Sequence, residues 1–127
     1  MKIYGIGTDI ANIKRINKSI KNKKFIKRLF NRIEIEKCNK QINKSNCYAK
    51  RFAAKEAFTK ALGTGVSGGI NLNEIIIQNT KTGKPGIILV GDTKKLVQKS
   101  IKKKKINIFL SLSDDLPFAI ATVVISA

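Results

Sequence analysis

The chain has 127 residues, a length typical of one domain, and 26 basic against 8 acidic residues give it a net charge of +18. It contains no histidine, and Cys38 and Cys47 do not have the spacing of metal ligands, which argues against a structural zinc site. No apolar run approaches the roughly 20 residues that cross a membrane, and the N-terminus lacks the pattern of a secretory signal. We therefore expect a single domain over residues 1–127 in the cytoplasm, without a membrane partner. Reduced thiols are the simpler interpretation of the cysteines, and a disulfide is the alternative.

The basic excess has three interpretations. It can serve phosphate contacts with nucleic acid, attract an acidic protein, or reflect biased composition with solvated lysines. The clusters at 21–24 and 102–105 contain no interleaved aromatic residues, and no helix-turn-helix or RNA-binding motif is present. We therefore favour solvated lysines for much of the excess. A small RNA-binding protein is kept as the alternative from another functional class.

The first predicted element is an apolar strand over residues 2–8, with Asp9 at its end. Gly5 and Gly7 lie within it, and glycine in a strand often marks the close approach of another backbone or a ligand. Isoleucines at helical spacing then predict a helix over about residues 10–20. From this pattern alone, Asp9 suits the N-cap of that helix as well as it suits a metal ligand.

The central element is an amphipathic helix over residues 51–62, in which small and apolar residues recur on one face. The other face is predicted to carry Lys55, Glu56, Thr59 and Lys60. Glu56 and Lys60 have the i, i+4 spacing of an ordinary surface ion pair, worth about 0.3–0.5 kcal/mol. Taken alone, this face therefore does not require a functional role.

The other elements complete an α+β pattern. In chain order they are short helices near 25–30 and 33–36, a glycine-rich loop at 65–69, strands over 73–78 and 87–90, a helix capped by Asp92, and strands over 106–112 and 118–125. Helices mainly precede strands, which predicts a mostly antiparallel sheet packed around the long central helix. We find no internal repeat and no linker.

Two motifs identify a family. Residues 5–10 read Gly-Ile-Gly-Thr-Asp-Ile, and residues 51–65 read Arg-Phe-Ala-Ala-Lys-Glu-Ala-Phe-Thr-Lys-Ala-Leu-Gly-Thr-Gly. Residues 83–85 read Gly-Lys-Pro, and 111–115 read Ser-Leu-Ser-Asp-Asp before the last strand. Together these segments resemble the holo-(acyl carrier protein) synthases, the short bacterial type of 4′-phosphopantetheinyl transferase. The resemblance spans residues 3–126 and implies the fold of that superfamily.

The resemblance also implies a reaction. The phosphopantetheine group of coenzyme A moves to a serine of apo acyl carrier protein, leaving adenosine 3′,5′-bisphosphate, with Mg²⁺ as cofactor, in fatty acid biosynthesis. Asp9 and Glu56 correspond to the metal ligands, and Glu56 and Lys60 to catalytic residues. Transfer from a diphosphate needs charge neutralisation and an oriented hydroxyl, and these residue types provide both. Either Glu56 or a metal-bound water is then the base.

Further contacts follow from the resemblance. The residues implied to bind coenzyme A are Arg51, Lys55, Lys84, Pro85 and Ser111, with Arg51 suited to bidentate binding of phosphate. For Lys84 and Ser111, a turn lysine and a solvent-facing hydroxyl are equally good interpretations. The acidic carrier protein is expected to bind the first helix through Lys14, Arg15 and Lys18. The family forms homotrimers with active sites at subunit boundaries.

Two positions depart from the family. Asp114 stands where some members carry histidine, and Asn12 stands where many carry glutamate. An aspartate cannot reproduce the contact of an imidazole with a nucleotide phosphate, and we assign Asn12 no role. A third alternative is a family member that binds coenzyme A but does not catalyse transfer. The presence of Asp9, Glu56 and Lys60 argues against it.

Overall fold

The computed structural model describes residues 2–63, 68–103 and 105–127. Residues 65–67 of the expected glycine-rich loop, and part of the basic cluster at 102–105, lie outside the described residues. The elements in chain order are β1 (Ile3–Asn12), α1 (Ile13–Ser19), α2 (Lys23–Leu29), α3 (Arg32–Asn39), α4 (Lys44–Leu62), the 3₁₀ turn η2 (Leu72–Glu74), β2 (Ile75–Asn79), β3 (Pro85–Leu89), α5 (Gly91–Ile101), β4 (Asn107–Asp115) and β5 (Phe118–Ser126). The predicted α+β class is confirmed.

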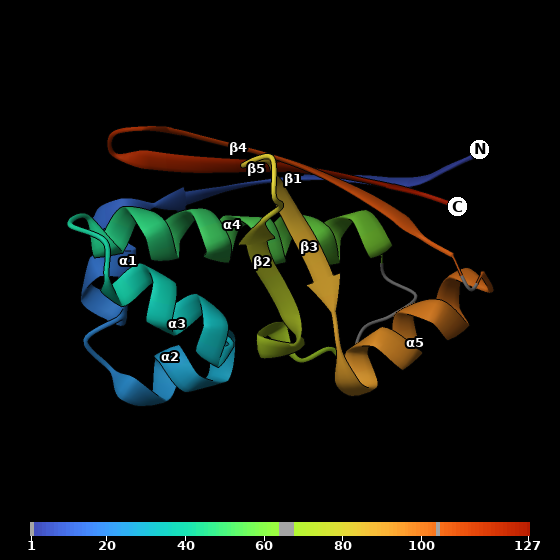
Figure 1. The fold of residues 1–127 in the computed structure, drawn as a ribbon, viewed down its shortest axis with the longest axis horizontal. Helices are drawn as coiled ribbons and strands as arrows, with labels where there is room; N and C mark the ends of the chain where they lie inside the picture. The colour runs from blue at the N-terminus through green and yellow to red at the C-terminus, as the bar shows by residue number, and fades with distance from the viewer. Residues whose placement is uncertain (1, 64–67, 104) are drawn as a thin grey trace.

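The fold has three layers, and the central helix α4 forms the middle one. The strands β1, β5 and β4 form an antiparallel sheet in that order, and β2 and β3 form a separate antiparallel hairpin. Figure 1 shows α4 lying along one face of the three-stranded sheet, with α1–α3, the hairpin and α5 on the other side of α4. The core therefore lies on both sides of α4, which is the longest helix at 19 residues.

Strand β1 lies unusually close to α4 because its inward positions are glycines. A Cβ atom on Gly5 would collide with the carbonyl oxygen of Ala61, and one on Gly7 with that of Ala57. The alanines on this face of α4 complete the close contact, since they add only a methyl group. The predicted close approach of another backbone is therefore confirmed for both glycines, and it places β1 directly against the helix.

The structure excludes the alternative that Asp9 caps a helix, and the prediction that Asp92 caps one is wrong. Strand β1 continues to Asn12, whose side chain accepts a hydrogen bond from the backbone N–H of Arg15 at 3.1 Å and caps α1. Asp9 therefore lies within the strand and does not cap a helix. The N-cap of α5 is Val90, and Asp92 lies in its first turn. The carboxylate of Glu74 caps α5 instead, because it accepts hydrogen bonds from backbone N–H groups of that turn.

The face of α4 that was predicted to be polar is partly buried. Lys55 is 0 % exposed, and its ammonium donates to Glu34 Oε1 at 2.7 Å, to the carbonyl of Leu72 at 2.8 Å and to the carbonyl of Ile75. Glu34 also accepts from the backbone N–H of Ile77 at 3.0 Å. The hairpin and α3 cover this side of α4. The prediction from a single apolar face therefore placed Lys55 in solvent, which is wrong.

The cysteines form a disulfide, so the expectation of reduced thiols is wrong for this structure. Cys38 in α3 and Cys47 in α4 have Cα atoms 5.4 Å apart, and neither is a free thiol. The short turn between α3 and α4 brings the two helices together at this point. Separately, among the described residues, no helix combines the length and apolar character needed to cross a bilayer.

Candidate active site

The structure brings together the three residues that the two motifs singled out. Lys60 Nζ lies 3.0 Å from Asp9 Oδ1 and donates to the carbonyl oxygen of Thr8 at 3.1 Å. Asp9 comes from β1, whereas Glu56 and Lys60 come from α4, one helical turn apart. Residues separated by about 50 positions in the chain thus form one cluster at the junction of the strand and the helix.

The folding of each element explains this arrangement. Successive strand residues point to opposite faces, so Asp9 shares the inward face of β1 with Gly5 and Gly7. Residues four apart on a helix lie on one side, so Glu56 and Lys60 can both approach that face. The close contact made by the glycines therefore sets how near Asp9 comes to α4.

The electrostatics of the cluster show two carboxylates competing for positive charge. Burial raises the pKa of Glu56, the negative charge of Asp9 raises it further, and the positive charge of Lys60 opposes both. The Asp9 side chain is 16 % exposed and pairs with Lys60, which is the more exposed partner at 57 %. The charges of Asp9, Glu56 and Lys60 therefore act on one another within this cluster.

Asp9 and Glu56 are of the residue type that could hold a magnesium ion. Mg²⁺ is usually held by one or two carboxylates, with substrate phosphates and waters completing its shell. Asp9 and Glu56 supply two oxygen-donor groups from different elements, and no cluster of three or more His, Cys, Asp or Glu ligands occurs among the described residues. A closed structural metal site does not match this donor set, whereas an open site does.

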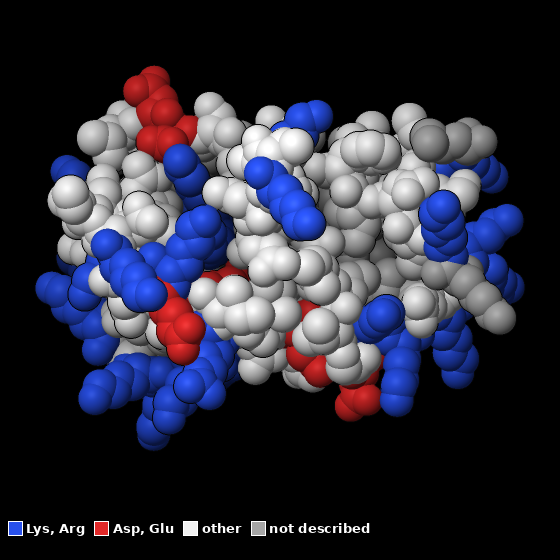
Figure 2. All heavy atoms as spheres, viewed as in Figure 1, with Lys and Arg blue, Asp and Glu red and all other residues white. Residues whose placement is uncertain are grey.

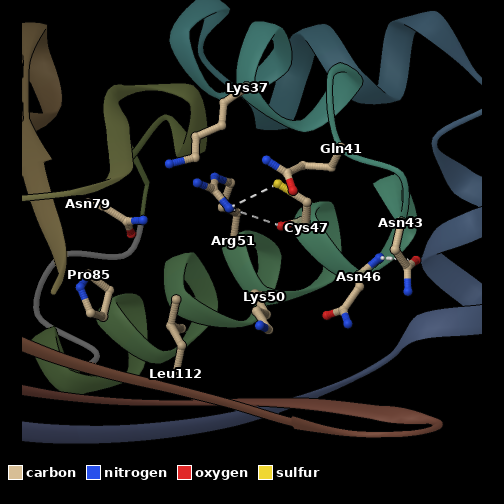
Figure 3. Close-up of a pocket in the computed structure, with 10 residues that line it drawn as sticks. All are labelled: Lys37, Gln41, Asn43, Asn46, Cys47, Lys50, Arg51, Asn79, Pro85 and Leu112. Carbon is tan, nitrogen blue, oxygen red and sulfur yellow. Dashed lines mark hydrogen bonds between the residues drawn. The ribbon is translucent and has the colours of Figure 1, made fainter. Parts of the chain in front are cut away.

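A second site lies beside α4, where a pocket of about 470 Å³ opens (Figure 3). It is lined by Lys37, Gln41, Asn43, Asn46, Cys47, Lys50, Arg51, Asn79, Pro85 and Leu112. These side chains come from α3 and its following turn, from α4, from the hairpin and from β4. Three of them are basic and none is acidic, so the pocket suits an anionic ligand.

Arg51 is the most constrained cation of this pocket. Its side chain is almost buried, with the residue 6 % exposed, and Nη1 donates to Cys47 Sγ at 3.1 Å and to the Cys47 carbonyl at 3.4 Å. Its Nε is buried without a hydrogen-bond partner among the described residues. Burial lowers the pKa of Arg51, while the charges of Glu34 and Tyr48 raise it. Arg51 thus places a guanidinium in the wall of the pocket, and guanidinium groups bind phosphate well.

The other residues expected to bind coenzyme A do not all lie in one place. Pro85 lines the pocket of Arg51 and also a neighbouring cavity of about 440 Å³, which contains Lys84 and Ser111. Lys55 does not join them, because its ammonium is buried against Glu34. We therefore correct its assignment: Lys55 is a structural residue in this chain and is not placed to contact coenzyme A.

Of the residues that line the pocket, the sequence analysis named only Arg51 and Pro85, and it missed the other two basic residues, Lys37 and Lys50. Lys50 Nζ lies 2.6 Å from Asp114 Oδ1, and Asn46 Nδ2 donates to Asp114 Oδ2 at 3.0 Å. These hydrogen bonds from Lys50 and then Asn46 lower the pKa of Asp114. The position of Lys50 directly before Arg51 was the only available signal. The departure at Asp114 now has a structural role, since it links β4 to α4.

The residues expected to bind the carrier protein lie on the surface of α1. Lys14, Arg15 and Lys18 are exposed, whereas Ile13 and Ile16 are buried. Figure 2 shows basic side chains gathered over the part of the molecule that holds α1–α3, with a second group over α5. The charge of α1 is therefore accessible to an acidic partner.

Comparisons with known proteins agree with this geometry. A family model described as the 4′-phosphopantetheinyl transferase superfamily matches residues 5–121. A holo-[acyl-carrier-protein] synthase of Pelagibacter ubique strain HTCC1062 is 47 % identical over 125 residues, covering 98 % of each chain. The crystal structure of the Neisseria meningitidis holo-[acyl-carrier-protein] synthase is 36 % identical with a TM-score of 0.86, covering 99 % of this chain and 100 % of that one.

A further solved structure carries a ligand. The Helicobacter pylori holo-[acyl-carrier-protein] synthase, in complex with coenzyme A, is 34 % identical with a TM-score of 0.77, covering 95 % of this chain and 99 % of that one. The family match and these full-length relatives confirm the resemblance drawn from the two motifs. The chain belongs to the 4′-phosphopantetheinyl transferase superfamily and, within it, to the holo-(acyl carrier protein) synthases.

Proposed function

We propose that this chain transfers the 4′-phosphopantetheine group of coenzyme A to a serine of apo acyl carrier protein, with Mg²⁺, in fatty acid biosynthesis in the cytoplasm. The observation that carries the proposal is the convergence of Asp9, Glu56 and Lys60 at the contact between β1 and α4. We also propose that residues 1–127 form one domain of this type, since buried residues from the helices and from both sheets join a single core.

The reaction assigns a task to each residue of the cluster. Mg²⁺, when bound, neutralises charge on the diphosphate of coenzyme A. Asp9 and Glu56 would hold the ion. The serine oxygen bonds to the phosphorus that carries the pantetheine arm, and the bond from that phosphorus to the leaving adenosine 3′,5′-bisphosphate breaks. Lys60 can then turn from Asp9 towards the leaving oxygen and stabilise its charge.

The serine must also lose its proton. The chain contains no histidine that could take it. We propose that Glu56, or a water held beside it, receives the proton.

The pocket of Arg51 supports binding of the nucleotide part of coenzyme A. Arg51 and Lys37 bring positive charge to the wall of this cavity, whereas the charge of Lys50 is paired with Asp114. We propose that this pocket receives a phosphate of coenzyme A. Lys84 and Ser111, in the neighbouring cavity, are the second group of contacts that we propose.

The outer face of the three-stranded sheet supports a homotrimer. This face exposes several large apolar side chains, including Ile6 at 62 % and Phe109 at 53 %. The set of outward apolar residues is Tyr4, Ile6, Ile10, Phe109, Phe118 and Ile120. A monomer rarely exposes so many neighbouring apolar groups. We propose that further copies of this chain cover the face; replacing Ile6 by lysine should then give a smaller species by light scattering.

The experiment that tests the reaction is mass spectrometry of apo acyl carrier protein after incubation with this protein, coenzyme A and Mg²⁺. We expect one added phosphopantetheine group, which is lost with EDTA and with Asp9→Ala. Glu36→Ala is the matched control, because Glu36 is an exposed carboxylate paired only with Arg32 in a surface ion pair. This control should retain the activity.

Two results would contradict the proposal. If folded protein modifies none of several carrier proteins, the chain is a family member that does not turn over. If it instead binds RNA in a salt-sensitive manner that Asp9→Ala does not change, its basic charge serves nucleic acid.

A further inference from the structure

The disulfide lies in the wall of the pocket that contains Arg51. Cys47 lines the pocket, as Figure 3 shows, whereas Cys38 is fully buried behind it. We propose that the Cys38–Cys47 pair is a redox-responsive site that sets the affinity of this pocket for a phosphate-bearing nucleotide. The inference rests on the proposed function in two respects, the assignment of this pocket to the nucleotide of coenzyme A and the cytoplasmic location.

Arg51 connects the sulfur chemistry to ligand binding. In the oxidised protein, its Nη1 donates to the disulfide sulfur of Cys47, which is uncharged and a weak acceptor. Its Nε has no partner among the described residues. The guanidinium is therefore positioned by the sulfur but keeps most of its capacity to bind an anion.

Reduction changes this balance. The thiolate of a small dithiol attacks Sγ of Cys47, which the pocket makes accessible, and the bond between the two sulfurs breaks with Cys38 as the leaving thiolate. The second thiol of the reductant then displaces Cys47. The reductant ends as a cyclic disulfide, and the protein has gained two electrons and, at full protonation, two protons.

A thiolate on Cys47 would lie beside the guanidinium of Arg51. Positive neighbours favour the thiolate form, and a charge-assisted hydrogen bond is about twice as strong as a neutral one. Arg51 would then be held by Cys47 and would bind a phosphate less readily. Reduction should therefore weaken nucleotide binding.

The disulfide also ties the two sides of the pocket together. Lys37 and Gln41 come from α3 and the turn after it, whereas Lys50 and Arg51 come from α4. Reduction removes the covalent link between these sides. The hydrogen bond from the Tyr48 hydroxyl to Asn39 Oδ1, at 2.8 Å, and the buried Glu34–Lys55 pair remain. We therefore expect a local effect on the pocket without unfolding.

The setting supports a responsive role rather than a permanent link. Disulfides of cytosolic proteins are usually transient and often sense redox state. Lys37 and Arg51 line the pocket together with Cys47, and their positive charges attract an anionic thiolate.

The test measures binding of adenosine 3′,5′-bisphosphate by calorimetry, because this ligand contains no thiol. The full chain is compared in its oxidised form and after reduction with dithiothreitol, with the redox state verified by thiol trapping and mass spectrometry. We expect the Kd to rise about fivefold on reduction, the scale of exchanging a neutral for a charge-assisted hydrogen bond. Circular dichroism should show the same fold in both forms.

Two variants separate the thiolate from the lost link. Cys38→Ser keeps Cys47 but cannot form the disulfide, so it should bind as weakly as the reduced protein under all conditions. Cys38→Ser/Cys47→Ser also lacks the link but has no thiolate, so its Kd should return towards the oxidised value and not respond to reductant. If both variants bind weakly, the link to the pocket wall is the cause.

Equal Kd values for oxidised and reduced wild-type protein would overturn the inference, as would the absence of a disulfide in an oxidising glutathione buffer. The carrier-protein transfer assay separates this failure from failure of the proposed function. Transfer with equal Kd values refutes only the redox site. Absence of both transfer and nucleotide binding refutes the assignment of the pocket itself, and the redox inference with it.

Discussion

The buried Glu34–Lys55 pair allows the most direct energetic test of this fold. Replacing Lys55 by methionine keeps the length and the apolar stem but removes the ammonium. The carboxylate of Glu34 would then keep only its backbone donors, Asn31 N at 2.9 Å and Ile77 N at 3.0 Å. It would be a buried charge without a counter-ion.

The cost follows from the groups that lose their partner. Besides the carboxylate of Glu34, the carbonyl oxygens of Leu72 and Ile75 lose the donor on Lys55. A stranded buried polar group costs about 1–3 kcal/mol, and breaking a buried ion pair from one side costs about 3–5 kcal/mol. We expect Lys55→Met to lower the free energy of unfolding by about 4 kcal/mol. For a chain of this size the melting temperature should fall by roughly 10–20 °C.

The assay is urea unfolding followed by circular dichroism, with Lys95→Met as the matched control because Lys95 is exposed on α5. The control should change stability by less than about 0.5 kcal/mol. A double-mutant cycle adds Glu34→Leu and the pair Glu34→Leu/Lys55→Met. The double variant should be more stable than the sum of the single effects predicts, since it strands no charge. A cost below 1 kcal/mol for Lys55→Met, or additive single effects, would refute the structural role of the pair.

Three other predictions follow from the site. Gly7→Ala should lower the free energy of unfolding by about 3 kcal/mol and reduce the transfer rate about 100-fold, because the new methyl group meets the carbonyl of Ala57 and pushes β1 from α4. A near-normal midpoint of urea unfolding together with near-normal activity would contradict this. Asp114→Asn should lower the free energy of unfolding by about 0.5 kcal/mol at neutral pH. This difference from wild type should vanish as pH falls through the lowered pKa of Asp114, because the wild-type protein then also loses its pair with Lys50. Urea unfolding at several pH values measures it, and a difference that persists in acid would contradict the prediction. Arg15→Glu should raise the KM for acyl carrier protein roughly tenfold and leave that for coenzyme A unchanged, whereas equal effects in steady-state kinetics would remove Arg15 from the docking surface.

The elements that sequence reasoning predicted well are those with a strong local signal. The 3.6-residue period of α4 and the apolar run of β5 identify a helix and a strand without knowledge of their neighbours. Gly5 and Gly7 also indicated that their strand lies close to another backbone, because only glycine allows a helix backbone to approach so near. Asp9 and Glu56 could therefore be assigned to a strand and a helix from the sequence, whereas their place in one site came from the resemblance to the family.

The errors concern contacts between distant segments. Lys55 appeared solvent-facing because a single helical period assigns one buried face, whereas α3 and the hairpin cover α4 from a second side. The capping of α5 by Glu74 depends on a residue 18 positions earlier. The disulfide depends on how α3 turns into α4. No local pattern contains this information, since each contact is decided by packing.

The position of the glycines links the stability of this protein to its chemistry. Gly5 and Gly7 bury β1 against α4, and the same strand face carries Asp9 to within 3.0 Å of Lys60. The opposite side of α4 is held by the ion pair of Lys55, the neighbour of Glu56. The carboxylates of the candidate metal site thus lie on the two elements that Gly5 and Gly7 bring into close contact. A change that loosens this contact should separate the carboxylates before it unfolds the protein, so loss of metal binding is the earliest sign of destabilisation that we expect here.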